Sequence, residues 1–256
     1  MSSRSITAIV VGIIVLGVAL AAVSQTLWRP FRTTSTTSHG TVSALDVRSG
    51  VGGVTLTTGD RAEVRASVTS WRPGASGRVS VEGGTLTLDG CGRWCRVQYE
   101  VTAPSGADLT GEMGSGNLTA ENLGQVAFET GSGSIDLTTV QGPISVEAGS
   151  GDIRGVAAAD TVKASTGSGN LTVTDAAGTV TAEAGSGNID LTLVEPVSAT
   201  LQTGSGNITA TVPAGPYRIA GTTGSGNRDV NVATDPASPY VLTLDTGSGN
   251  VTVQPR

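Results

Sequence analysis

Thr166-Gly167-Ser168-Gly169-Asn170, the stretch TGSGN, decides the fold because close copies of it recur along the second half of the chain. A repeat of under two dozen residues cannot enclose a hydrophobic core of its own, so its copies must stack on one another. Successive copies start 17, 18, 18, 18, 19, 20 and 23 residues apart, because GSG begins at Gly114, Gly131, Gly149, Gly167, Gly185, Gly204, Gly224 and Gly247.

Apolar and polar residues alternate on both sides of the motif, as they do in β-strands. After the motif, Leu171 and Val173 flank the polar Thr172. Before it, Val162, Ala164 and the small residue Thr166 fall on one face. The next apolar position after Thr166 is Leu171, five steps on, so the alternation breaks inside the motif. Each GSGN therefore predicts a bend that joins two short strands.

Two strands and two bends in about 18 residues predict an all-β fold, a parallel β-solenoid with rungs about 4.8 Å apart. Antiparallel hairpins are the alternative, but they would not align like residues in columns. We expect the GSGN-repeat solenoid over residues 111–256. Residues 41–110, whose strand-like runs follow no strict period, are expected to form an irregular N-terminal β cap. The longer last repeats and an inward-facing Arg228 predict that the coil loosens or is capped near its C-terminus.

The first 40 residues differ in composition from the rest. Ile6–Val23 is 18 residues long without a charge, and as a helix it would span about 27 Å, close to the hydrocarbon thickness of a bilayer. We expect a membrane anchor over residues 1–28, with its helix at about 6–28; a signal peptide cleaved at Ala19-Leu20-Ala21 is the alternative. Residues 29–40, RPFRTTSTTSHG, are polar and aperiodic and predict a Ser/Thr-rich linker.

Cys91 and Cys95 are the only cysteines. Fully extended, they would lie about 13 Å apart, so a disulfide between them needs a tight bend over Gly92–Trp94. The pair offers too few ligands for structural zinc, and free thiols are the alternative. A loop disulfide is typical of exported proteins and indicates that the C-terminal domain is extracytoplasmic. Together with the predicted anchor, it indicates a single-pass protein of the cell membrane.

The motif does not match the known glycine-rich ligand loops. A Walker loop needs Gly-Lys-Ser/Thr and a following helix, and the nine-residue halves of calcium-binding β-rolls need a recurrent Asp. We expect a structural corner instead, in which Gly permits positive φ and stacked Asn side chains exchange amide hydrogen bonds. Ser134 and Asp152 would interrupt this turn ladder, whose expected members are Asn117, Asn170, Asn188, Asn207, Asn227 and Asn250.

An acidic column lies beside the motif. Glu112, Glu129 and Glu147 occupy the outward position two residues before GSG, so stacking would place their charges at rung spacing. Like charges that close repel unless they are solvated or bridged by a cation, so a solvated edge is the expectation and a metal site the alternative.

We expect no cofactor. The net charge of −6 and the pI near 4.7 argue against a nucleic-acid partner.

Catalytic constellations find little support in the sequence. The sole histidine, His39, falls in the expected linker, which leaves no Ser–His or Cys–His pair. A polysaccharide-cleaving solenoid would need converging carboxylates, and the best cluster is Asp136, Arg154 and Asp190. A salt pair across rungs explains that cluster more simply, so we expect no enzyme.

The segment CGRWCRVQYEVTAPSGADL, Cys91–Leu109, is followed by strands punctuated by G-x-G-x-hydrophobic. In this respect the chain resembles the bacterial "putative adhesin" β-strand-repeat domains of unknown function, over about Thr41–Val253. Such proteins commonly carry an N-terminal anchor and a Cys pair before a V-x-Y-x-V-x-x-P-x-G segment. This chain departs slightly, with Ala103-Pro104-Ser105-Gly106 where Val-Pro-Ala-Gly is usual. The resemblance implies a surface-exposed, non-catalytic role and transfers no binding residues.

These observations together predict an adhesin-like interaction module of the cell surface or envelope. Its expected partners are the lipid membrane, through the N-terminal helix, and an envelope or surface protein or glycan. One alternative is an accessory in envelope-stress signalling, whose anchor contacts a membrane sensor. The other is a solenoid that binds divalent cations or glycans or, in the extreme case, cleaves polysaccharide.

Overall fold

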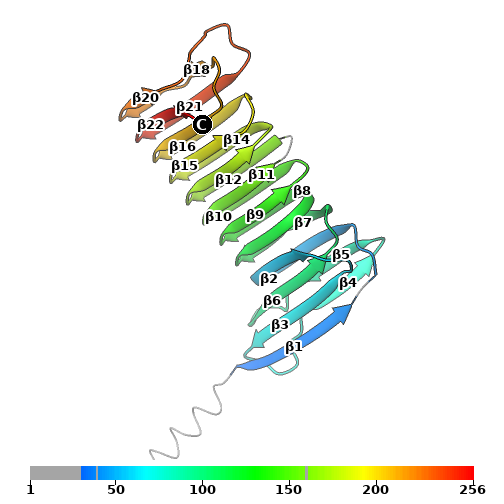
Figure 1. Cartoon of the computed structure of the whole chain (residues 1–256). Helices are drawn as coiled ribbons and strands as arrows, with labels where there is room; N and C mark the ends of the chain where they lie inside the picture. Colours follow the sequence, from blue (N-terminus) through cyan, green and yellow to red (C-terminus); the bar gives the residue numbers. More distant parts are fainter. Residues whose placement is uncertain (1–29, 39, 159–160) are drawn as a thin grey trace, which may run out of the picture.

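The computed structural model describes residues 30–38, 40–158 and 161–256. These residues form an elongated all-β rod of 22 strands (Figure 1). Within these ranges no helix has the length and apolarity to cross a bilayer. The anchor predicted over residues 1–28 lies outside the described residues.

The strands follow one another with short connections along most of the chain. In order they are β1 Phe31–Ser38, β2 Ala44–Thr58, β3 Glu63–Ser70, β4 Arg78–Glu82, β5 Thr85–Asp89, β6 Cys95–Ala103, β7 Ala107–Ser115, β8 Leu118–Ser132, β9 Ile135–Val140, β10 Ile144–Ser150, β11 Ile153–Ala158, β12 Thr161–Ser168, β13 Leu171–Ala176, β14 Thr179–Ser186, β15 Ile189–Leu193, β16 Ala199–Ser205, β17 Ile208–Val212, β18 Arg218–Ala220, β19 Thr223–Ser225, β20 Arg228–Val230, β21 Val241–Ser248 and β22 Val251–Pro255.

The repeats form rungs, each made of one strand before a GSGN corner and one after it. In the rung of β12 and β13, β12 pairs in parallel with β10 and β14, while β13 pairs in parallel with β11 and β15. Like positions lie side by side, so Val162 is opposite both Ile144 and Val180. The prediction of an all-β chain of stacked parallel strands is confirmed.

The core runs along the rod between the two faces of each rung. The inward positions expected on either side of the corner are buried, as Val162, Thr166 and Leu171 show in one rung. Equivalent positions in the other rungs stack on them and form one continuous apolar cluster. Alternate residues point outward, and Lys163 among them is exposed. The period of two therefore holds within each arm and breaks only at the corner.

The glycines of the corner approach the neighbouring rung more closely than any side chain allows. Gly187 has φ +140°, and a Cβ there would overlap the carbonyl oxygen of Gly169 in the rung below. The preceding glycine is constrained as well, because a Cβ on Gly185 would lie 2.6 Å from the carbonyl oxygen of Gly167. A residue other than Gly at either place would push the rungs apart.

The expected boundary near residue 110 does not exist, because the parallel stack begins well before it. β2 pairs in parallel with β7 and with the start of β8. Its residues Gly50-Val51-Gly52-Gly53 stand in the corner position, since Val51 lies opposite Ser115 and Val54 opposite Leu118. Val51 replaces the motif's Ser, which hides this copy from a search for GSG. Residues 41–110 therefore contribute to the stack, and only part of them forms the cap that the sequence predicts.

The N-terminal end is closed by antiparallel strands. β3 pairs antiparallel with β6, β4 with β5, and β1 with β3. The linker predicted over residues 29–40 is thus largely wrong, because Phe31–Ser38 forms edge strand β1. All eight of its residues are exposed, so it has no buried face and no hydrophobic period to reveal it.

At the C-terminal end the order of rungs in space differs from their order in the sequence. β21 lies between β16 and the pair β18 and β19, and β22 lies between β17 and β20. The chain first forms the outer rung and then returns to insert its last one beneath it. Arg228 donates hydrogen bonds to the carbonyl oxygens of Gly221 (2.8 Å) and Ala220 (2.7 Å) in that outer rung. The capping expected from the long last repeats takes this form.

The close glycine contact predicts that Gly187→Ala is strongly destabilising. Positive φ and overlap with the Gly169 carbonyl should together lower the free energy of unfolding by at least about 2 kcal/mol. Gly155→Ala in β11 is the matched control, because among the described residues, its two chain neighbours aside, no atom lies within 4 Å of its Cβ position. Urea unfolding followed by circular dichroism measures both variants. Equal stabilities for the two would contradict the packing described for the corner.

Candidate functional site

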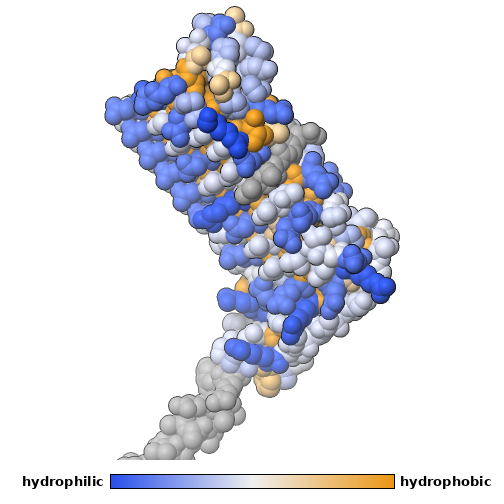
Figure 2. Space-filling model, viewed as in Figure 1, coloured by the Kyte–Doolittle hydropathy of each residue, from blue (hydrophilic) through white to orange (hydrophobic). Residues whose placement is uncertain are grey.

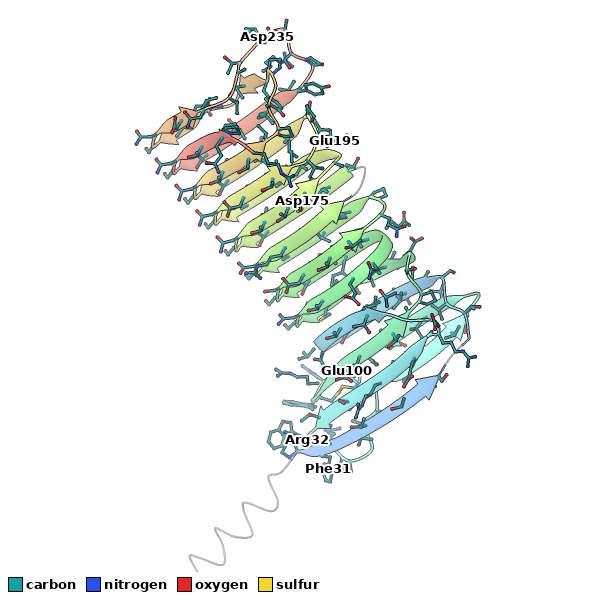
Figure 3. The ribbon with its side chains drawn as sticks, in the orientation of Figure 1. Phe31, Arg32, Glu100, Asp175, Glu195 and Asp235 are labelled. Carbon is teal, nitrogen blue, oxygen red and sulfur yellow. A yellow bond between two sulfur atoms is a disulfide. The ribbon has the colours of Figure 1, made fainter. Side chains whose placement is uncertain are left out.

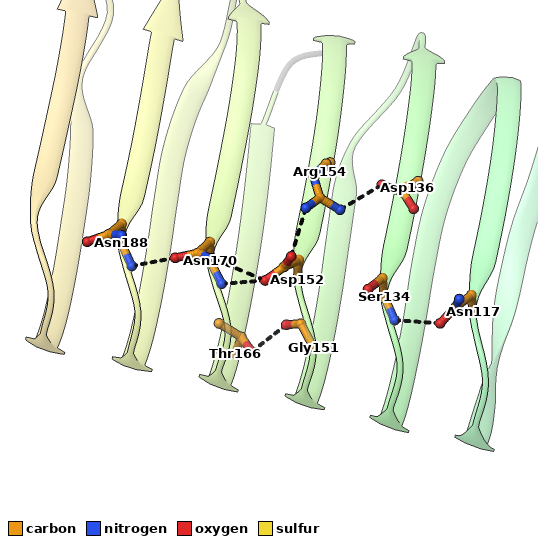
Figure 4. A network of polar contacts seen from close by, with 9 residues as sticks. All are labelled: Asn117, Ser134, Asp136, Gly151, Asp152, Arg154, Thr166, Asn170 and Asn188. Carbon is orange, nitrogen blue, oxygen red and sulfur yellow. Dashed lines mark hydrogen bonds and ion pairs between the residues drawn. The ribbon is translucent and has the colours of Figure 1, made fainter.

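The motif asparagines form a ladder of hydrogen bonds along the corner edge (Figure 4). The Oδ1 of Asn170 accepts from the backbone N–H of Asn188 at 3.0 Å, and the Oδ1 of Asn188 accepts from that of Asn207 at 2.9 Å. The ladder continues from Asn207 to Asn250 and from Asn250 to Asn227, following the order of rungs in space. In most of its hydrogen bonds a backbone N–H donates to an Asn Oδ1, whereas we expected bonds between side-chain amides. One amide–amide bond accompanies them, from Asn207 to Asn188 at 3.3 Å.

The two departures from Asn behave differently in this ladder. Asp152 continues it, because its Oδ1 accepts from the N–H of Asn170 at 2.9 Å. That backbone hydrogen bond, with Arg154 nearby, lowers the pKa of the Asp152 carboxyl. At Ser134 the backbone N–H donates to Asn117 at 3.0 Å. In the described part of the chain, the shorter Ser134 side chain makes no such bond to the next rung.

Only part of the charged cluster expected across rungs is assembled. Arg154 pairs with Asp152 at 2.7 Å and with Asp136 at 3.4 Å. Asp190 is separated from Arg154 by Thr172, which lies opposite both. The guanidinium is half exposed, so these pairs contribute little to stability. The Arg154–Asp136 pair links two neighbouring rungs on the outer surface, whereas Asp152 and Arg154 belong to the same rung.

The predicted acidic column lies in register on the outer surface. Glu129 is opposite both Glu112 and Glu147, and all three side chains are exposed. Among the residues that the structure describes, no three His, Cys, Asp or Glu side chains are grouped to hold a metal ion. The column continues along the rod with mixed chemistry, through Ser165, Glu183, Gln202 and Asp245.

This column lines a shallow groove of about 720 Å³ beside the corner glycines. Glu147, Glu183 and Gln202 point into it, and Asp245 closes one end, where its Oδ1 accepts from the Thr222 N–H at 2.7 Å. A second hollow of about 430 Å³ adjoins it and is lined by Glu129, Lys163 and others. Outward side chains of successive strands can be followed along the rod in Figure 3. The groove offers carboxylates, an amide and hydroxyls at the regular spacing of the rungs.

The face of the rod seen in Figure 2 is mostly polar. In Figure 2, hydrophilic residues line one edge of the rod, while apolar atoms show between them in places.

Lys163 stands in the outward position four residues before GSG, level with Ala127 and Ser145 in the adjoining hollow. Sequence reasoning did not select this second column, although its constant place relative to the motif would have identified it.

The cysteines form a disulfide, with their Cα atoms 5.9 Å apart. Their loop joins β5 to β6 and stands at a corner of the stack, because Asp89 lies opposite Arg48 and Val97 opposite Gly52. A disulfide-closed loop thus takes the place of the glycine corner in the rung below β2. The buried Tyr99 hydroxyl supports this corner by donating to the Asp89 carbonyl at 2.5 Å, and burial raises its pKa to about 12.

Residues 42–254 match the family model described as Toastrack DUF4097. The chain belongs to this family. The resemblance to bacterial "putative adhesin" repeat domains of unknown function is confirmed. No curated protein matches the chain.

Solved structures share the fold of this chain at low sequence identity. A "putative adhesin" from Bacteroides fragilis matches with a TM-score of 0.57 at 17% identity, over 87% of this chain and 97% of that one. A "putative lipid binding protein" from Parabacteroides distasonis matches with a TM-score of 0.55 at 15% identity, over 86% and 96%. A "putative adhesin" from Parabacteroides merdae gives 0.50 at 10% identity, over 86% and 95%. These likenesses establish the fold.

The ladder predicts that position 188 requires an acceptor and does not require an amide. Asn188→Ala removes the acceptor of the Asn207 N–H and should lower the free energy of unfolding by about 1–2 kcal/mol. Asn188→Asp keeps the acceptor, as Asp152 does naturally, and should cost less than half as much at neutral pH. Thermal and urea unfolding of both variants measure the difference. The interpretation fails if Asp is as damaging as Ala.

Proposed function

We propose that this Toastrack chain is a membrane-anchored, extracytoplasmic binding module that holds the groove beside its glycine corners toward an envelope or cell-surface partner. The observation that carries the proposal is the groove itself, of about 720 Å³ and lined by Glu147, Glu183 and Gln202 at fixed register. A surface repeated at rung spacing complements an extended partner better than a compact small molecule.

The chemistry of the groove supports binding in preference to catalysis. Its carboxylates stand in a row on parallel strands and none is buried, so no carboxyl is placed to act as an acid opposite a base. The exposed carboxylates of the groove suit pairing with cationic groups, and Gln202, together with Lys163 of the adjoining hollow, suits hydrogen bonds to hydroxyls. Such contacts are typical of a recognition surface for a glycan or a protein segment.

Location outside the cytoplasm is supported by two features of the chain. The Cys91–Cys95 disulfide is of a kind that persists in oxidising compartments. The uncharged run Ile6–Val23 has the length of a bilayer-spanning helix. A rod that leaves the membrane from its N-terminal end would hold the groove of β10 to β21 at a distance from the bilayer.

A photocrosslinking residue at Gln202 tests the proposed function in living cells. With p-benzoylphenylalanine in place of Gln202 in the full chain, we expect capture of a discrete envelope or surface partner, identified by mass spectrometry. The matched control carries the same residue at Asp190, which is exposed on the other arm of the neighbouring rung. Adding Glu183→Lys beside Gln202 should reduce the yield at least about fivefold, in line with 1 kcal/mol of binding energy.

The captured species distinguishes the forms that the function can take. A wall glycan or a neighbouring-cell protein supports adhesion, whereas a membrane sensor kinase supports a role in envelope-stress signalling. Equal capture from Gln202 and Asp190, with no response to Glu183→Lys, would contradict a role for the groove.

A further inference from the structure

Three aromatic side chains are exposed at the N-terminal end of the rod. Phe31, Trp71 and Trp94 are 53%, 59% and 61% exposed, more than any other large hydrophobic residue that the structure describes as exposed. They belong to separate parts of the chain, at the start of β1, just after β3 and just before β6. Burial of such side chains releases several kcal/mol, so their joint exposure indicates a surface that is covered in use.

Strand register brings the three aromatics to one end. Ser70 lies opposite both Phe31 and Cys95, and the Trp71 N–H donates to the Trp94 carbonyl at 3.3 Å. Figure 3 shows Phe31 and Arg32 at the tip of the rod. The three exposed aromatics therefore lie together at the N-terminal tip of the rod.

Arginines surround these aromatics. Arg32 and Arg96 lie in one row on either side of Thr69, and Arg72 and Arg93 are sequence neighbours of the two tryptophans. All four arginines are exposed, and within the described ranges none forms an ion pair, since the pairs found involve Arg48, Arg65, Arg154 and Arg256. In a chain of net charge −6, this end is a local concentration of positive charge. We call Phe31, Trp71, Trp94, Arg32, Arg72, Arg93 and Arg96 the aromatic-arginine end.

The covalent chain places this end close to the uncharged segment. Only Ser24–Pro30 separates Ile6–Val23 from Phe31. Fully extended, that connection spans about 25 Å at most. If Ile6–Val23 spans a bilayer, the aromatic-arginine end must lie near its headgroups.

We propose that the aromatic-arginine end docks onto anionic phospholipid headgroups. Trp rings favour the interface between headgroups and acyl chains, and Arg side chains are attracted to an anionic membrane surface. Three aromatics and four unpaired arginines on one tip match that environment in both polarity and charge. Docking would fix the tilt of the rod, so that the groove is held away from the bilayer. This inference rests on the proposed membrane anchor and assigns a second, independent contact to the membrane.

Tryptophan fluorescence tests the docking directly. The chain has three tryptophans, so Trp28→Phe leaves Trp71 and Trp94 as the only emitters. The full chain is reconstituted into phosphatidylcholine vesicles with and without phosphatidylglycerol, using lipids brominated near the headgroup as quenchers. We expect emission to fall by at least about half in the anionic vesicles and by clearly less in the neutral ones.

Arg→Gln variants distinguish docking onto anionic headgroups from a position of the tryptophans that is merely close to the membrane. Replacing Arg32, Arg72, Arg93 and Arg96 with Gln should remove most of the additional quenching in anionic vesicles, while the disulfide and the β-sheet spectrum are retained. The matched control is Arg218→Gln, at the opposite end of the rod, and it should leave quenching unchanged.

The outcomes distinguish this inference from the proposed anchor. A chain that floats with the vesicles but shows no quenching of Trp71 and Trp94 keeps the anchor and overturns the docking. A chain that does not float with the vesicles overturns the anchor, and the docking with it. Equal quenching in neutral and anionic vesicles overturns the role of the arginines. Shielding of the two tryptophans by soluble wall-glycan fragments, with no effect of brominated lipid, would make this end a glycan-binding surface instead.

Discussion

The stacking of glycine on glycine at each corner is the constraint on which the rest of the structure depends. A carbonyl oxygen of one rung occupies the space that a Cβ would need in the next, as it does between Gly169 and Gly187. This contact fixes the register of neighbouring rungs, and the register in turn aligns the buried columns, the Asn ladder and the outward column. The groove at Glu147 and Glu183 is thus a consequence of the same backbone packing.

The two ends of the stack solve the problem of open sheet edges in different ways. At the N-terminus, antiparallel strands and the Cys91–Cys95 corner close the rod, and polar β1 forms the outermost edge. At the C-terminus, the last rung inserts beneath an outer one, so Arg228 rather than the chain terminus satisfies carbonyl groups of the outer rung. Both arrangements leave the repeat in the middle free to vary its outward side chains without loss of register.

Much of this structure could be predicted from the sequence, because the corner motif constrains both arms of a rung. The inward columns, the outward Glu column and the place of Arg154 beside Asp136 all follow from counting residues relative to GSG. The rung of β2 could not be predicted from the sequence, because Val51 breaks the motif and only the strand register in the structure identifies its corner. Strand β1 has no buried face, and the aromatic-arginine end is assembled from three separate segments. A local pattern carries no information about either feature.

The most direct test of the stacked-corner account is the order of rungs at the C-terminal end. In the structure, Thr209 lies opposite Thr252, and Thr252 lies opposite Asp229. Neighbouring parallel strands are about 4.8 Å apart, within reach of a disulfide, whereas strands two apart are at about twice that distance and are not. We predict that Thr209→Cys with Thr252→Cys forms a bridge under oxidation, and that Thr209→Cys with Asp229→Cys does not. Bridging of the second pair without the first would contradict the inserted rung and the register on which the account rests.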